Sequence, residues 1–173
     1  MADWGKAIRS RLGLARGRFA KREIHQELRS IALGVDLATI AVEDGRPWSG
    51  AAVAVMELNV SGTVATIVAT ADGGVSMYLG SGGGVIGAGE HAAVQPAAER
   101  FRNVSADSRG LLQGADGFPL PEAGQVRFHV RTADGDYSGA ADEAALRAGR
   151  HPLSPLYAAG QDLLTEIRLS AEH

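Results

Sequence analysis

The glycine-rich stretch at residues 80–89 is the part of this 173-residue chain whose composition most suggests ligand chemistry. Gly82, Gly84 and Gly87 fit the spacing G-x-G-x-x-G, after a predicted strand and before a predicted helix. In dinucleotide-binding proteins such glycines let backbone amides approach a pyrophosphate at the N-terminus of a helix. The stretch therefore predicts a site for phosphate or a nucleotide. The residues expected to bind this anion are Ser81, Gly82, Gly83, Gly84 and Gly87.

The sequence around this stretch also supports a purely structural alternative. The strands before it are separated by hairpin turns, whereas the dinucleotide fingerprint requires a parallel β-α-β unit. Glu90 and His91 stand where a P-loop carries Lys and Ser or Thr, and the Glu90 carboxylate would compete with a phosphate for the positive end of the helix. A tightly turned connection between strand and helix is the other interpretation.

Catalytic and metal-binding signatures are sparse in this sequence. The absence of Cys excludes cysteine nucleophiles and thiolate metal sites, and no nucleophile elbow surrounds Ser81. Glu90 and His91, beside the glycines, remain the candidate catalytic pair for a hydrolase or an isomerase. We expect no bound metal or cofactor, because the histidines lack the close pairing of a local zinc site. Four of them lie one to a predicted element: His25, His91, His129 and His151.

The N-terminal region has the apolar spacing of amphipathic helices. Apolar residues recur at steps of three and four, with one step of five after Phe19, which predicts helical pieces at residues 3–15 and 19–33. Gly34 is expected to end the second piece. A lone helix cannot keep an apolar stripe in water, so this stripe must lie on the body of the protein, on a second copy or on a partner, and we favour an interface with a second copy or a partner protein. The interface residues are Trp4, Ile8, Leu12 and Phe19.

Charge is distributed unevenly along the chain. Residues 1–31 carry a formal net charge of +5, whereas the remainder carries −8. A basic arm on an acidic body can bind nucleic acid or an anionic surface, dock on its own body, or dock on a second copy, and these alternatives stay open. Arginines interrupt the apolar run that a secretory signal needs, and no run approaches the roughly 20 apolar residues of a membrane span. We therefore expect a cytoplasmic protein without a transmembrane segment.

Alternating apolar residues predict an antiparallel sheet. Ala51–Asn59, Thr63–Thr70 and Val75–Leu79 are separated by short links that contain glycine, which favours a three-stranded meander. Gln125–Arg131 and Asp136–Ala140 predict a second hairpin. An edge strand at residues 35–42 is left open.

Helical segments are expected between and after these strands. Helical spacing over Glu90–Arg102 predicts a helix that either begins near Gln95 or is kinked by Pro96. Residues 105–124 are rich in Gly and Pro and predict a long loop, with a short helical turn as an option at its start. A short helix is expected at Asp142–Ala148, and a last helix begins near Ser154.

These elements indicate an α+β fold, with an antiparallel sheet of about five strands covered by helices on one face. We expect a basic helical arm at residues 1–34 and a single domain at residues 35–173. In outline this resembles the profilin-like and roadblock-like adaptor modules, although those usually place two strands before the middle helix and three after. The first functional prediction is therefore a non-enzymatic interaction or adaptor module, ahead of an anion-binding protein and an enzyme.

Overall fold

The computed structural model describes residues 21–40, 42–43 and 46–172. Its α+β architecture confirms the predicted fold class. The α-helices are α2 (Lys21–Leu33), α3 (Leu37–Ile40), α4 (Gln95–Asp107), α5 (Glu143–Arg147) and α6 (Ser154–Ser170). The strands are β1 (Val42–Glu43), β2 (Arg46–Pro47), β3 (Val53–Val60), β4 (Thr63–Thr70), β5 (Val75–Leu79), β6 (Gly84–Ile86), β7 (Gln113–Gly114), β8 (Gln125–Thr132) and β9 (Gly135–Asp142). Short 3-10 helices lie at Ala88–Glu90 and Ser108–Leu111.

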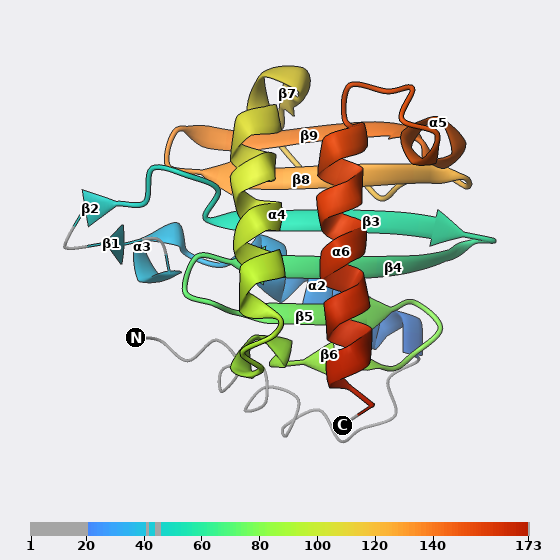
Figure 1. Ribbon diagram of the computed structural model, residues 1–173, viewed down its shortest axis with the longest axis horizontal. Helices are drawn as coiled ribbons and strands as arrows, with labels where there is room; N and C mark the ends of the chain where they lie inside the picture. Colours follow the sequence, from blue (N-terminus) through green and yellow to red (C-terminus); the bar gives the residue numbers. More distant parts are fainter. Residues whose placement is uncertain (1–20, 41, 44–45, 173) are drawn as a thin grey trace.

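A seven-stranded antiparallel sheet forms the centre of the molecule, in the order β6-β5-β4-β3-β8-β9-β7 (Figure 1). The predicted meander is β3-β4-β5, and the predicted second hairpin is β8-β9. The two outermost strands, β6 and β7, were not predicted. They have three and two residues, which is too short for an alternating apolar pattern to be visible.

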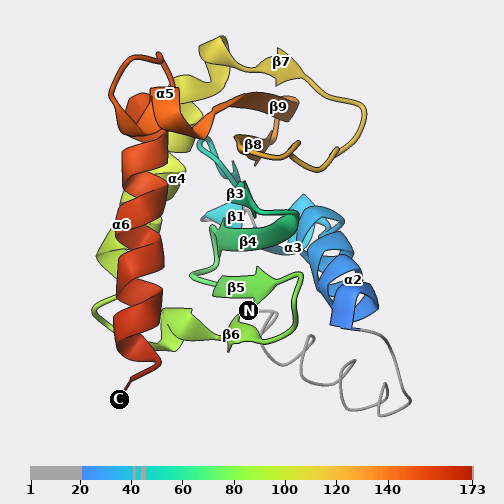
Figure 2. The ribbon, with the colours of Figure 1, turned by 90° about the vertical axis from the view of Figure 1, so that its right-hand side faces the viewer.

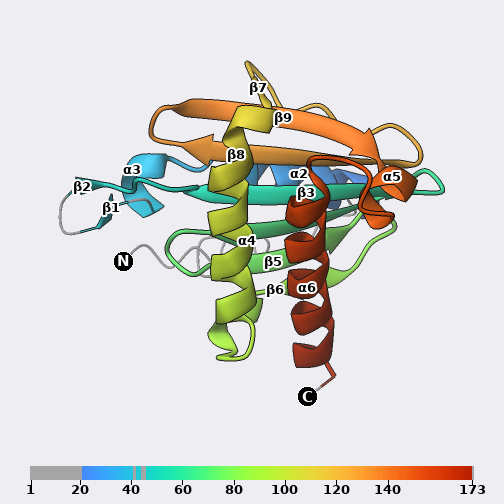
Figure 3. The ribbon, with the colours of Figure 1, turned by 45° about the horizontal axis from the view of Figure 1, so that its top comes forward.

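Helices lie on both faces of this sheet. Helices α4 and α6 run side by side over one face, and α2 and α3 lie against the other (Figures 2 and 3). The expectation that helices cover a single face was therefore wrong. The reason lies in β3, which is buried continuously from Val53 to Leu58, so that both of its faces need a covering layer.

The face under α4 and α6 has an apolar core. Met56 of β3 and Ile67 of β4 are fully buried there, together with Phe101 of α4 and Leu163 of α6. Gly160 allows α6 to approach the sheet closely, because a Cβ atom at this position would lie 2.5 Å from Sδ of Met56. The two helices are thus held by shape and by apolar burial.

The opposite face receives α2. Leu28, Ala32 and Leu33 are buried in one cluster with Val53 and Val68 of the sheet. The second half of the predicted N-terminal arm therefore packs on the sheet. The division into an arm at residues 1–34 and a domain at residues 35–173 stays a prediction.

Local signals explain several remaining segments. Helix α4 begins at Gln95 with Pro96 in its first turn, which settles the choice between a late start and a kink. Within the range 35–42, where an edge strand was left open, Leu37–Ile40 form the short helix α3 and Val42 begins β1. The Asp36 side chain stabilises the start of α3 by accepting a hydrogen bond from the amide of Ala38. The helical turn considered after residue 105 is present as the end of α4 and Ser108–Leu111. Within the described ranges, no helix is both long enough and apolar enough to cross a membrane.

Candidate binding site

The glycine-rich segment forms a hairpin rather than a direct connection from strand to helix. Residues 80–83 turn the chain from β5 into β6, and α4 begins only at Gln95. The amide of Gly80 donates to the carbonyl of Val64 at 2.8 Å, and the amide of Gly82 donates to the carbonyl of Leu79 at 2.9 Å. These two amides are therefore engaged within the sheet and the turn.

The five predicted ligand-binding residues are spread along this hairpin. Ser81 is exposed in the turn, whereas Gly82 and Gly83 line a cavity described below. Gly84 pairs with Tyr78 in the sheet. Gly87 lies at the far end of β6, where its left-handed backbone (φ 80°) precedes the 3-10 helix. Anion binding by these residues stays a prediction, and the structure draws attention to the two that share a cavity.

Glu90 and His91, the candidate catalytic pair, end the 3-10 helix that follows β6. Both residues are exposed. Neither of them lines the two cavities found beside α2. A catalytic role for the pair remains a prediction.

A cavity of about 310 Å³ lies between the first turns of α2 and the β5–β6 hairpin. We call it the α2 cavity. Ile24, which is 37% exposed, and the exposed Gly83 place its opening at the surface. A second cavity of about 130 Å³ also has His25 in its wall, beside the turn between β3 and β4. The residues lining the α2 cavity are Ile24, His25, Leu28, Tyr78, Leu79, Gly82 and Gly83.

A buried polar network underlies His25. Its centre is Glu57 of β3, a fully buried carboxylate. Arg29 of α2 donates to both carboxylate oxygens, from Nε to Oε1 at 2.6 Å and from Nη2 to Oε2 at 2.8 Å. The Thr66 hydroxyl donates to Oε1 at 2.8 Å, and Nε2 of His129 lies 3.2 Å from Oε2. His25 joins this network through Nε2, 3.0 Å from Oγ1 of Thr66.

The network fixes the charge state of Glu57. Burial alone would raise the pKa of this carboxyl group, but hydrogen bonds from His129 and Arg29 outweigh burial and bring the pKa to about 2. Glu57 is therefore ionised at neutral pH. Its negative charge is compensated chiefly by the guanidinium of Arg29.

His25 is affected in the opposite direction. Burial lowers its pKa below the ordinary value of 6.5, although the charge of Glu57 partly opposes this effect. The imidazole is therefore neutral at pH 7. A neutral histidine offers one hydrogen-bond donor and one acceptor, which is suitable chemistry for the wall of a ligand site.

Sequence reasoning did not single out Glu57, Arg29 or Thr66, and it treated His25 and His129 as unrelated. One signal was present in the strand itself, because Glu57 is the only charged residue of Val53–Val60 and shares its face with Val53 and Val55. Four-residue spacing also puts His25 and Arg29 on one face of α2. The predicted interface residues lie outside the described part of the chain: Trp4, Ile8, Leu12 and Phe19.

Comparisons of this chain with protein-family models, with curated proteins and with solved structures found no match. Within the described ranges, no group of three or more His, Asp or Glu side chains is arranged to hold a metal ion. The α2 cavity and the network beneath it are therefore the features of the described residues that bear on function.

Proposed function

We propose that this protein binds a small molecule in the α2 cavity. The observation that carries the proposal is a cavity of about 310 Å³ whose wall combines aliphatic side chains with two buried polar residues, His25 and Tyr78. Ligand sites in proteins typically have volumes of about 300–1,000 Å³, with mostly apolar walls and a few polar groups that orient the ligand. The α2 cavity matches the small end of this range.

The lining favours an uncharged ligand over phosphate or a nucleotide. Ile24, Leu28 and Leu79 contribute aliphatic surface, and Tyr78 contributes an aromatic ring. Every residue of this lining is uncharged, given that His25 is neutral at pH 7. A desolvated anion would find no compensating charge among these side chains, so its binding would be costly.

The proposal is tested by titrating the full chain with 4-ethylphenol and, separately, with inorganic phosphate, while recording amide resonances by NMR. We expect 4-ethylphenol to shift the resonances of Leu28, Gly82 and Gly83. An Ile24→Trp variant should abolish these shifts, because the indole would occupy the mouth of the cavity. The matched control is Glu27→Trp, which places the same side chain on an exposed part of α2 that does not line the cavity.

Three results would contradict this proposal. Shifts of Gly82 and Gly83 with phosphate, and none with 4-ethylphenol, would support the anion-binding alternative instead. Shifts with neither compound, or equal shifts in both Trp variants, would leave the cavity without a ligand role.

We propose, as a second candidate, a non-enzymatic interaction module that self-associates or captures a protein partner. It is supported by the apolar stripe at Trp4, Ile8, Leu12 and Phe19 and by the +5 charge of residues 1–31 against −8 elsewhere. Apolar burial and charge complementarity would act together in a homodimer.

Deleting residues 1–20 tests the self-association version, because the deletion leaves α2 intact. Light scattering should show a dimer or larger assembly for the full chain and a monomer for the shortened chain. A monomer in both cases would contradict self-association.

A further inference from the structure

The hydrogen atoms of the Glu57 network can be assigned from its chemistry. Glu57 is a carboxylate, so both of its oxygens can only accept hydrogen bonds. The Thr66 hydroxyl has one hydrogen, which it donates to Oε1 of Glu57 at 2.8 Å. Oγ1 of Thr66 can therefore only accept from Nε2 of His25, at 3.0 Å. The hydrogen of the neutral His25 ring must be on Nε2.

This assignment leaves Nδ1 of His25 with a free lone pair. In a neutral imidazole the nitrogen without hydrogen is a hydrogen-bond acceptor. Among the described residues, the hydrogen bond recorded for His25 is made through Nε2, and the residue is only 4% exposed. The ring forms part of the wall of both cavities. A hydrogen-bond acceptor in the wall of a cavity helps to determine which ligands bind there.

His129 provides an internal comparison. Nη2 of Arg29 has two hydrogens, which are used by Oε2 of Glu57 at 2.8 Å and by the carbonyl of Phe118 at 2.6 Å. Nε2 of His129 lies 3.3 Å from Nη2 of Arg29 and 3.2 Å from Oε2 of Glu57. Because a carboxylate can only accept, Nε2 of His129 is assigned as the donor to Oε2. Nδ1 of His129 is buried without a partner among the described residues, and His129 does not line either cavity. Both histidines are thus assigned a hydrogen on Nε2, but only His25 belongs to a cavity wall.

We propose that the ligand of the α2 cavity is an uncharged molecule with a hydrogen-bond donor, such as a phenol, an alcohol or an amide N–H, which donates to Nδ1 of His25. This inference rests on the proposed small-molecule function and narrows it to a chemical class. Glu57 and Thr66 do not touch the ligand. They act as positioning residues that hold the acceptor nitrogen of His25 in place.

The tautomer is tested without any ligand by long-range proton–nitrogen NMR of the histidine rings in the full chain at pH 7. We expect Nδ1 of His25 to appear as an unprotonated nitrogen and Nε2 as a protonated one. Addition of 4-ethylphenol should shift Nδ1 of His25 and leave the ring nitrogens of His129 unchanged. A protonated Nδ1 in the free protein would overturn the inference.

The ligand class is tested with three probes of similar size: 4-ethylphenol, 4-ethylanisole and 4-ethylbenzoate. The methyl ether has no donor, and the benzoate is an anion. Because one neutral hydrogen bond is worth about a five- to tenfold change in affinity, we expect the phenol to bind about five- to tenfold more tightly than the anisole. The benzoate should bind more weakly than the anisole, because its charge would be buried without compensation.

Two variants separate an orienting role from a merely structural one. His25→Phe removes the acceptor, and Thr66→Val removes the hydroxyl that fixes the tautomer while keeping the side-chain shape. Both should reduce the ratio of phenol affinity to anisole affinity toward one, with the anisole affinity unchanged.

Equal binding of phenol and anisole by the unmodified chain would overturn the donor class but keep the cavity as a ligand site. Failure of all three probes to bind would overturn the proposed function itself.

Discussion

The two faces of the central sheet are both buried under helices, but different interactions stabilise them. Under α4 and α6, Met56 and Ile67 meet other apolar side chains, and nothing directional is required. One residue further along β3 and one residue back along β4, Glu57 and Thr66 point to the α2 face and are held by hydrogen bonds. Successive residues of a strand point to opposite faces of the sheet, so neighbouring positions in the sequence lie in different environments. Apolar burial under α4 and α6 does not depend on protonation state, whereas the Glu57 network on the α2 face depends on the charge of its members.

Introducing a charge on the apolar face should have the largest effect. Ile67→Asp would bury an unpaired carboxylate in a central strand, and we expect a loss of about 4 kcal/mol or more in the free energy of unfolding. Val60→Asp is the matched control, because Val60 ends β3 and is largely exposed. Urea denaturation measures both variants. An unchanged midpoint for Ile67→Asp would contradict the placement of β4.

Removing one member of the Glu57 network should lower the free energy of unfolding nearly as much. The size of the loss should depend on whether the buried charge of Glu57 remains. Arg29→Leu leaves Glu57 buried without its bidentate partner, and we expect a loss of about 3 kcal/mol. Adding Glu57→Leu removes the uncompensated charge, so the double variant should be less destabilised than the sum of the two single variants. A double-mutant cycle in urea measures this coupling. Strict additivity would show that the Arg29–Glu57 contact contributes no interaction energy.

Lowering the pH should weaken the α2 face in two steps. The pKa of His25 is lowered in the folded state, so the unfolded chain takes up its proton first, and stability falls as the pH decreases below about 6.5. The pKa of Glu57 is about 2 when folded against an ordinary 4.5, so its contribution is present above about pH 4.5 and is lost toward pH 2. Midpoints of urea unfolding across this range measure both steps.

Each step has its own control. His25→Phe should remove the loss that begins below about pH 6.5. The Arg29→Leu/Glu57→Leu double variant should flatten the loss between about pH 4.5 and 2. If both variants keep the full acid dependence of the unmodified chain, other titrating groups are responsible.

The contrast between the faces also explains what the sequence revealed. The meander and the β8–β9 hairpin were predictable because Val60-Ser-Gly62 and Asp72-Gly-Gly74 mark the turns and apolar residues alternate between them. Strand β6 was not predictable, because Gly84-Val-Ile86 carries too little pattern. The sequence indicated only one side of the α2 cavity, the side formed by Gly82 and Gly83. Its other half comes from α2, and contacts between segments more than 50 residues apart leave no trace in local spacing.

The polar network was harder to predict for the same reason. Glu57 is a lone charge in an apolar strand, but this signal does not identify its partners, which come from α2, β4 and β8. Sequence spacing pairs residues within one helix or strand, whereas α2, β3 and β8 must all be folded before Arg29 and His129 can contact the carboxylate of Glu57. The histidines therefore looked unrelated until the register of the sheet brought them together.

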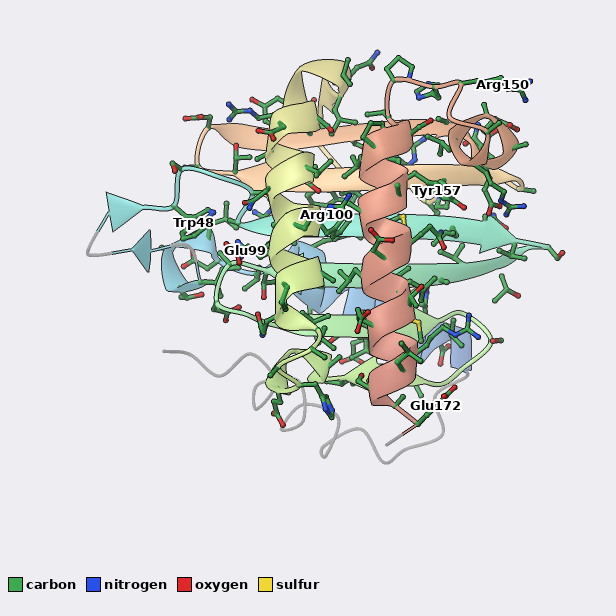
Figure 4. All side chains as sticks on the ribbon, in the orientation of Figure 1. Trp48, Glu99, Arg100, Arg150, Tyr157 and Glu172 are labelled. Carbon is green, nitrogen blue, oxygen red and sulfur yellow. The ribbon has the colours of Figure 1, made fainter. Side chains whose placement is uncertain are left out.

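The smallest effect is expected where a salt bridge lies on the surface of the apolar layer. Arg100 of α4 and Asp162 of α6 form an ion pair at 2.9 Å between the two helices, on the outer side shown in Figure 4. Their side chains are 62% and 55% exposed, compared with 13% and 0% for Arg29 and Glu57. Water and salt screen such an exposed pair, so Arg100→Ala should change the free energy of unfolding by less than about 0.5 kcal/mol. A double-mutant cycle with Asp162→Ala in low salt and in 1 M NaCl should show a coupling that is small and then disappears, while the Arg29–Glu57 coupling persists in both. An Arg100–Asp162 coupling as large and as salt-resistant as the buried one would mean that burial is not what separates the two faces, because the same pair of charges would then act alike on either side of the sheet.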